Sequence, residues 1–402
     1  MSLTLISFLG KSVADPSRGY RPARYRFADG TIHETPYFGL ALAQQLRAAK
    51  LILIGTASSM WDVLIENTVG DAGAEESRLA LMDAVREGQV DEALLERLQP
   101  AFARHLGFEI KTIVIPTGAA PADQQQLLVR LSDLLESEAH VAIDITHGFR
   151  HLAMLGLAAT RYLQHSKNVC TQGLYYGALD MMQEGVAPVV ELSGLAHLQE
   201  WAEALAAFDA SGDFSRFAQL LERDGLDPVH TRALAKAWPL LAMNNVSDAA
   251  RGLRQAVRAL DEPLHGASGL FQERLRKSLR WVHETELHEQ MLQLAVQALR
   301  RDDFLRAAIL GLESFLARIV AEQGGDPLDY AARERAGQDF GRELRDGEHA
   351  DRKRNDFWLL RNIRNALAHG TLPTYKPHAQ LLKNPDRLRT ELSATLNQLT
   401  NT

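Results

Sequence analysis

The chain has 402 residues, of which 46% are hydrophobic and 24% charged, and its formal net charge is −7. This length can bury the cores of two or three domains. The negative charge argues against a general nucleic-acid coat, so any contact with RNA has to be local. Cys170 is the only cysteine, which excludes intramolecular disulfides and a cysteine-based zinc site. With no signal-peptide pattern and no apolar run of bilayer length, we expect a cytoplasmic protein without a membrane partner.

Strands and helices alternate in the first half. Apolar runs predict strands over residues 3–8, 50–55, 109–115, 140–145, 169–176 and 188–192. Residues 20–32 are expected to form an extended segment or a hairpin that turns at Gly30. Helical patterns lie between the strands, over residues 36–49, 74–104, 121–136 and 152–164. The predicted fold is therefore α/β, with a doubly wound, mostly parallel, Rossmann-like sheet.

Ligands of such sheets bind beyond the carboxyl ends of the strands. The segments expected there are rich in glycine and hydroxyl side chains and carry two cations, which together suit phosphate oxygens. Trp61, Tyr175 and Tyr176 are candidates for stacking on bases. Such residues are also common wherever a strand turns into a helix, but five such segments at one edge favour a nucleotide-like ligand. The candidate ligand-binding residues are Gly10, Lys11, Ser12, Thr56, Ser58, Ser59, Trp61, Thr146, His147, Gly148, Arg150 and Tyr176.

Three motifs of this region resemble the CARF (CRISPR-associated Rossmann fold) domain of accessory proteins in type III CRISPR systems. They are Asp144-Ile-Thr146-His147-Gly148-Phe-Arg150, Gly55-Thr56-x-x-Ser59-Met60-Trp61-Asp62 and Tyr175-Tyr176-Gly177-Ala178-Leu179. The similarity spans roughly residues 3–192. It implies a sensor of cyclic oligoadenylates, with cyclic tetra-adenylate as the favoured activator. The glycine pattern of a dinucleotide site is absent, and we predict neither a cofactor nor a metal site.

The second half is predicted to be almost entirely helical from about residue 194. Near its end, residues 357–368 form a helical pattern that Gly370 closes. Arg361, Asn365 and His369 share one face of this helix, and the long side chain of Arg364 can swing toward them. Guanidinium groups can offset charge on a phosphorane, and an imidazole can move a proton near neutral pH. This set of groups therefore suits an RNA phosphodiester, although a solvated helix face is the ordinary interpretation of such residues.

Arg364-Asn365-Ala-Leu-Ala-His369 resembles the signature of HEPN ribonucleases, with residues 304–313 as the candidate first helix of that domain. On that helix, Glu313 either orients Arg364 through an ion pair or forms a surface salt bridge. The basic residues 352–354, with Arg361 and Arg364, are the local cluster that could meet RNA. The resulting domain prediction is a sensor over 1–192, a helical connector over 193–300 and a HEPN ribonuclease core over 301–402.

Together the two resemblances imply a cyclic-oligoadenylate-activated, metal-independent ribonuclease of CRISPR antiviral defence. It would act on single-stranded RNA as a homodimer or a higher oligomer of dimers. The 2′-OH of the RNA would attack and leave a 2′,3′-cyclic phosphate. Arg364 would stabilise the phosphorane, His369 would handle the proton or position the 2′-OH, and Asn365 would hold both.

Two alternatives remain open at this point. The first is a sensor that binds a partner or DNA without catalysis, although no helix-turn-helix with a basic recognition helix is evident. The second is a sensor domain that also cleaves its own cyclic ligand, with Lys11, Ser12 and Arg150 as the groups to test.

Overall fold

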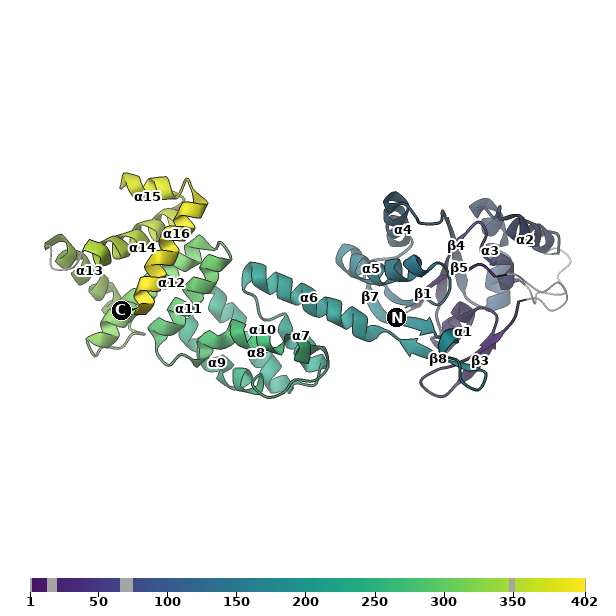
Figure 1. The fold of residues 1–402 in the computed structure, drawn as a ribbon, viewed down its shortest axis with the longest axis horizontal. Coiled ribbons are helices and arrows are strands. Elements are labelled where there is room, and N and C mark those ends of the chain that lie inside the picture. Colours follow the sequence, from purple (N-terminus) through teal and green to yellow (C-terminus); the bar gives the residue numbers. More distant parts are fainter. Residues whose placement is uncertain (1, 13–19, 66–74, 347–350, 402) are drawn as a thin grey trace. The chain divides into compact units, whose positions relative to one another are not determined.

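The computed structural model describes residues 2–12, 20–65, 75–346 and 351–401, with side chains in the last range described from 355 to 398. The chain divides into two compact units, Met1–His197 and Leu198–Thr402. The first unit is α/β and the second is helical, which confirms the predicted fold class (Figure 1).

An eight-stranded sheet forms the centre of the first unit, in the order β3-β2-β8-β7-β6-β1-β4-β5. Five adjacent strands are parallel: β7 (Cys170–Gly177), β6 (His140–Asp144), β1 (Leu3–Phe8), β4 (Lys50–Thr56) and β5 (Glu109–Ile115). β8 (Val186–Glu191) pairs antiparallel with β7 and parallel with β2 (Ala23–Arg26). β2 and β3 (Ile32–Thr35) form the predicted hairpin, in which Gly30 has a φ of +86°. The mostly parallel sheet is therefore extended at one side by a mixed edge.

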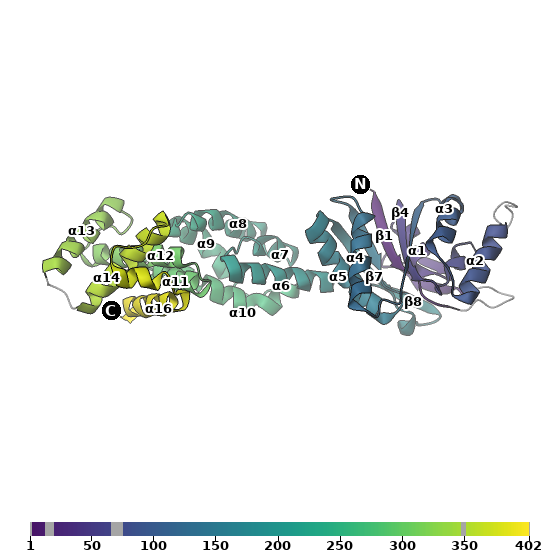
Figure 2. The ribbon, with the colours of Figure 1, turned by 90° about the horizontal axis from the view of Figure 1, so that it is seen from above.

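Strand residues alternate between two hydrophobic cores, as expected for strands buried on both faces. Leu5, Leu51 and Leu53 belong to the core beneath α1 (Phe38–Gln45), α2 (Glu75–Glu87) and α3 (Glu92–Leu106). Ile6, Ile52 and Ile143 belong to the core beneath α4 (Pro121–Asp133) and α5 (Arg150–Lys167) (Figure 2). Helices thus cover both faces and leave the ends of the strands as the accessible edge.

Unit 2 contains helices only, among the residues that the structure describes. After α6 (Ser193–Ser211), within which the division between the units falls, the helices are α7 (Phe217–Arg223), α8 (Pro228–Ala242), α9 (Val246–Ala259), α10 (Gly266–Leu279), α11 (Leu287–Arg300), α12 (Phe304–Glu322), α13 (Tyr330–Asp346), α14 (Asp351–His369), α15 (Lys376–Leu381) and α16 (Pro385–Asn401). One hydrophobic cluster extends from Trp201 on α6 to Leu396 on α16. This core continues across the predicted boundary at residues 300 and 301. The division into a connector and a ribonuclease core stays a prediction.

Candidate functional site

The order of the parallel strands reverses direction at β1. From β1 the chain builds outward through β4 and β5 on one side, and through β6 and β7 on the other. The carboxyl ends of β1 and β6 therefore flank the topological switch point, where ligands of doubly wound sheets bind. The predicted ligand-binding segments that follow β1 and β6, residues 10–12 and 146–150, meet at this point.

Two glycines let the loops after β1 and β6 approach each other. A Cβ added to Gly10 would lie 3.0 Å from the backbone nitrogen of Gly148, which is tighter than ordinary packing. Gly148 has a φ of +92°, in the region that favours glycine. A side chain at position 10 would separate the loops, and one at position 148 would crowd Phe8, so both predicted residues shape the floor of the site with their backbones.

A buried carboxylic acid lies beneath these loops. Asp144 has no exposed surface, and its Oδ2 accepts a hydrogen bond of 2.5 Å from the Ser7 hydroxyl. Its Oδ1 accepts a bond of 2.8 Å from the Thr146 backbone, while Ser7 also bonds to the Tyr37 hydroxyl at 2.5 Å. Burial raises the pKa of Asp144 to about 6, despite the hydrogen bonds from Ser7 and Thr146, which lower it. This network fixes the start of the loop after β6.

His147 is an uncharged member of the site at neutral pH. Its Nε2 accepts a hydrogen bond of 3.2 Å from the backbone nitrogen of Phe38, which leaves the ring proton on Nδ1. Burial lowers the pKa of His147 to about 4, and its ring packs against Tyr37 with the centroids 5.3 Å apart. Next to it, the Thr146 hydroxyl accepts a bond of 2.7 Å from the Gly177 nitrogen, which joins the ends of β6 and β7. These side chains position the loop and add no positive charge to it.

The loop after β4 is held by its own side chains. The Ser59 hydroxyl bonds to the Leu9 carbonyl at 2.9 Å and accepts the Thr56 N–H at 2.9 Å, and Ser58 Oγ lies 3.3 Å from Thr56 Oγ1. Trp61 has no exposed surface, and its indole N–H donates to the Thr56 carbonyl at 2.8 Å. The prediction that Trp61 stacks on a base is therefore wrong in this structure. The ring fills the space beside Gly55, where a Cβ would lie 2.7 Å from it.

Exposed cations and an exposed carboxylate lie around the switch point. Lys11, Ser12 and Arg150 are exposed. Tyr176 is half-buried, and its hydroxyl donates to Asp180 at 2.6 Å, which lowers the pKa of that carboxylate. The positive charge of Arg150 also lowers the pKa of Asp180, so the Arg150 guanidinium lies close enough to this carboxylate to influence it. Of the predicted phosphate-binding groups, Lys11, Ser12 and Arg150 are thus exposed at this edge, whereas the Ser59 and Tyr176 hydroxyls already donate hydrogen bonds within the protein.

Phe149 is an aromatic residue of this edge that sequence reasoning passed over. Its side chain is 47% exposed and stacks on His151 with the centroids 5.6 Å apart. His151 in turn contacts the Thr117 carbonyl at 2.9 Å. An exposed ring held in place by a neighbour can stack on a base, as the buried Trp61 cannot. Its place between Gly148 and Arg150 was the signal in the sequence.

The second candidate site lies along α14, in the helical unit. The helix ends at His369, and Gly370 has a φ of +64°. The Thr371 N–H donates to the Ala366 carbonyl at 3.0 Å, which completes the C-terminal cap that Gly370 predicts. Arg361, Arg364 and Asn365 are half-buried, whereas His369 is exposed at the helix end. The side chains of residues 352–354, which were predicted to join this basic cluster, lie outside the described residues.

A cavity of about 200 Å³ opens between α12, α13 and α14. Arg361, Arg364 and Glu313 line it together, as does Arg333 of α13. The guanidinium of Arg361 lies 5.4 Å from the Trp358 ring centroid and 5.9 Å from that of Phe357. The described residues therefore bring together three members of the predicted site, while Asn365 and His369 do not line the cavity.

The ion pair of Glu313 is not the predicted one. Its Oε2 lies 3.3 Å from Nε of Arg333, and Nη1 of Arg333 donates to the Pro327 carbonyl at 3.1 Å. No ion pair between Glu313 and Arg364 is present in the described part of the chain. Arg333 was missed because only the packing of α13 against α12 brings it to this carboxylate. Of the two roles expected for Glu313, the ion pair with Arg364 is not formed between the described side chains, and the carboxylate instead forms a salt bridge with Arg333.

Neither metal sites nor membrane spans emerge from the described residues. Within ranges 2–12, 20–65, 75–346 and 351–401, no cluster of three or more His, Cys, Asp or Glu side chains could hold a metal ion. The helices described in those ranges include none with the length and apolar character to cross a membrane.

A family model and a known protein each match part of this chain. Residues 4–180 match the family model described as "CRISPR system endoribonuclease Csx1, CARF domain". The first unit therefore resembles a CARF domain, in line with the resemblance of its motifs, and the matching model is of the Csx1 type. The chain is also 28% identical over 227 residues to CRISPR-associated protein MJ1674 of Methanocaldococcus jannaschii, covering 52% of this chain and 36% of that protein. The match thus spans about a third of the length of the relative, and the chain is homologous to a CRISPR-associated protein.

Proposed function

We propose that this protein is a cyclic-oligoadenylate-activated endoribonuclease of a type III CRISPR system. The observation that carries the proposal is the CARF domain followed by a helical unit in which Arg364 faces a cavity shared with Arg361 and Glu313. The family of the matching model is described as an endoribonuclease, which supports a catalytic second unit over a purely regulatory one.

In this proposal the activator binds at the switch point of the sheet. Lys11 and Arg150 meet its phosphates, with Ser12, Thr56, Ser58 and Thr146 as hydroxyl partners. Phe149 and Tyr176 are the rings available to its bases. Gly10 and Gly148 admit the ligand close to the backbone, and the neutral His147 maintains the loop. We favour cyclic tetra-adenylate as the ring.

In the helical unit, RNA cleavage begins with attack of the substrate's 2′-OH on the adjacent phosphorus. The bond to the 5′-oxygen breaks, and a 2′,3′-cyclic phosphate and a 5′-hydroxyl end result. Arg364 offsets the charge of the phosphorane, while His369 transfers the proton or positions the 2′-OH. Asn365 holds these groups, and Arg361, fixed over Trp358, supports the positive field. The chemistry is proposed to need no metal.

Two copies of α14 face each other in this proposal, so that the active site is composite and the protein acts as a homodimer or an oligomer of dimers. Ligand binding changes the rate only if the ligand has different affinities for two arrangements of the protein. DNA resists cleavage because it lacks the attacking hydroxyl.

Substitutions on α14 test the proposed active site. Labelled single-stranded RNA is incubated in EDTA with saturating cyclic tetra-adenylate and either wild type, Arg364→Ala or His369→Ala. Each substitution is expected to lower the cleavage rate about 10²- to 10⁴-fold, the usual range for positioned acid–base groups and charge-stabilising donors. Arg342→Ala is the matched control, since this arginine of α13 is 67% exposed and pairs with Asp339.

Equilibrium binding of cyclic tetra-adenylate separates the two sites. Arg364→Ala and His369→Ala are expected to bind the ring as wild type does. The site assignment is wrong if both variants cleave RNA at the rate of wild type.

A further inference from the structure

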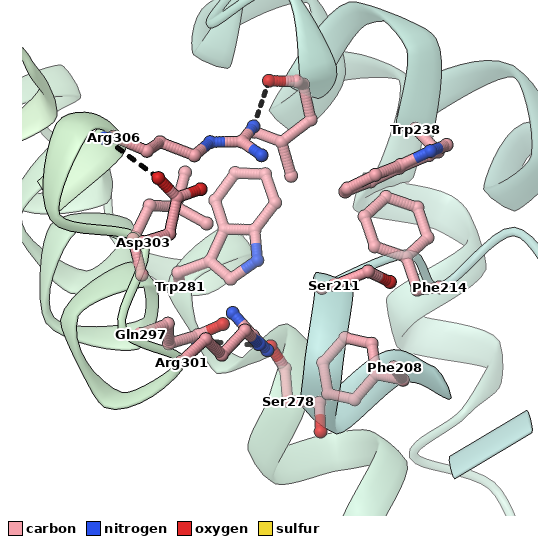
Figure 3. Close-up of a pocket in the computed structure, with 14 residues that line it drawn as sticks. Phe208, Ser211, Phe214, Trp238, Ser278, Trp281, Gln297, Arg301, Asp303 and Arg306 are labelled. Carbon is pink, nitrogen blue, oxygen red and sulfur yellow. Dashed lines mark hydrogen bonds between the residues drawn. The ribbon is translucent and has the colours of Figure 1, made fainter. Parts of the chain in front are cut away.

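A second cavity of the helical unit lies away from α14. It is enclosed by residues of α6, α8, α10, α11 and the start of α12 (Figure 3). Four aromatic side chains line it: Phe208, Phe214, Trp238 and Trp281. Two arginines, Arg301 and Arg306, project toward the same space. Aromatic walls with two cations are unusual for a structural void, because voids in protein cores are normally apolar.

Arg301 lacks a hydrogen-bonded or ion-paired partner within the described residues. Its guanidinium lies 4.7 Å from the centroid of the Phe208 ring and packs beside Gly212, where a Cβ would lie 3.2 Å from Nη1. Burial lowers the pKa of Arg301. A partly desolvated guanidinium loses hydration that a cation–π contact restores only in part. Its donors are therefore available to an acceptor in the cavity.

Arg306 adds a second charge to the same space. It lies 5.7 Å from the centroid of the Trp238 ring, and its Nη2 donates to the Leu241 carbonyl. Burial is the main cause of the lowered pKa of Arg301; the charge of Arg306 lowers it further, whereas the carboxylates of Asp209 and Asp303 raise it. An anion placed between the two guanidiniums would offset their mutual repulsion and accept hydrogen bonds from their N–H groups.

The described carboxylates near the cavity do not form ion pairs with the two arginines. Two carboxylates lie near Arg301, and one of them, Asp209, pairs with Arg274 at 2.6 Å. The other, Asp303, caps α12 by accepting the Arg306 backbone N–H at 3.1 Å. Among the described side chains, no ion pair joins either carboxylate to Arg301 or Arg306. Trp281 is buried, and its ring nitrogen points toward the middle of the cavity (Figure 3). Because an indole nitrogen can only donate, it adds a third donor to the two guanidiniums.

We propose that this cavity is a binding site for a compact oxyanion of the phosphate type, held by Arg301 and Arg306 with the indole N–H of Trp281. The cavity measures about 20 Å³, and one water-sized group needs roughly 10–15 Å³. The buried group is therefore no larger than a single tetrahedral oxyanion. Bound there, it joins the start of α12 to α6 and α8. The site is separate from the CARF site and from α14, and does not depend on the proposed ribonuclease activity.

The test is titration of the full-length protein with inorganic phosphate by isothermal calorimetry, at constant ionic strength set with sodium chloride. Wild type is expected to show saturable one-site binding and a rise in melting temperature with phosphate, because a ligand bound only to the folded state stabilises it. Arg301→Gln is expected to weaken binding at least tenfold, and Arg251→Gln, an exposed arginine of α9, to leave it unchanged. If Arg301→Gln does not fold, Arg306→Lys is the second variant. It keeps the positive charge and removes the planar guanidinium, so an intermediate loss of phosphate affinity is expected.

Two further probes identify the form of the anion. Methyl phosphate distinguishes the terminal phosphate of a larger molecule from free phosphate, since only an open cavity accepts the added methyl group. Acetate tests whether a planar carboxylate serves as well, and a stronger response to acetate than to phosphate would overturn the tetrahedral assignment. Absence of saturable phosphate binding by wild type, or equal binding by wild type and both arginine variants, would overturn the site itself.

Discussion

Asp144 combines complete burial with two hydrogen bonds at the centre of the candidate ligand site. The sequence placed this residue in a motif, but the burial that raises its pKa to about 6 depends on the strands either side of β6. The same holds for the burial of Trp61 and for the ion pair of Glu313. Residue types at a turn or on a helix were predictable, whereas their exposure and partners depend on segments distant in the chain.

The carboxyl group of Asp144 is expected to make stability depend on pH. An unfolded Asp ionises near pH 3.9, whereas the folded group keeps its proton until about pH 6. Between these values the folded state binds more protons, so the free energy of unfolding falls as pH rises and levels off above pH 6. Asp144→Asn removes this dependence. The stability of Asp144→Asn relative to wild type is expected to rise by about 2 kcal/mol from pH 4 to pH 7, at roughly 1.4 kcal/mol per pKa unit, because the unfolded Asp is already about half ionised at pH 4.

Urea titrations of wild type and Asp144→Asn across pH 4 to 7.5 measure this difference. Burial lowers the pKa of His147, which produces a trend of opposite sign, but this trend is common to both proteins and cancels. Asp180→Asn is the control, because the Tyr176 hydroxyl lowers the pKa of Asp180 and any effect there has the reverse sign. A difference between wild type and Asp144→Asn that stays constant with pH would contradict the assignment.

At the scale of elements, the period of apolar residues located most of the strands and helices. The period of apolar residues did not locate the ends of elements whose terminal residues are polar or pair with a distant strand. Helix α14 begins at Asp351 instead of the predicted residue 357, because its first turn is polar and carries no apolar stripe. β8 begins at Val186, two residues early, because Arg24 of β2 pairs with Val186 in a ladder that local sequence does not reveal.

The end of α14 makes a prediction about Gly370. Its φ of +64° is strained for any residue with a Cβ, so Gly370→Ala is expected to cost about 1–2 kcal/mol. Gly252→Ala is the matched control, since Gly252 lies inside α9 and an added Cβ would meet nothing within 4 Å. That change is expected to be neutral or to stabilise by up to about 1 kcal/mol. Urea midpoints of the two variants check the prediction, and equal effects would show that Gly370 does not cap the helix.

At the scale of the whole molecule, the sequence indicated a Rossmann-like sheet followed by helices, and the fold confirms this arrangement. The match of residues 4–180 to a CARF family model agrees with it. The motifs succeeded because the carboxyl ends of parallel strands converge at one edge whatever the lengths of the helices between them. One hydrophobic core includes both α11 and α12 and so continues across the predicted domain boundary at residue 300. Local sequence could not reveal this, since helical patterns continue through the boundary. Cavities such as that between Arg301 and Arg306 arise from tertiary packing, and no local pattern indicated them.

The central claim is that a ring of adenylates at the sensor sets the rate of RNA cleavage in the helical unit. The most direct test measures the cleavage rate of labelled single-stranded RNA by wild type in EDTA with no nucleotide, with cyclic tetra-adenylate and with linear tetra-adenylate. The account predicts that only the cyclic ring accelerates cleavage, by at least tenfold, and that the products end in 2′,3′-cyclic phosphates. Cleavage at the same rate in all three samples, or no cleavage despite measured binding of the ring, would contradict it.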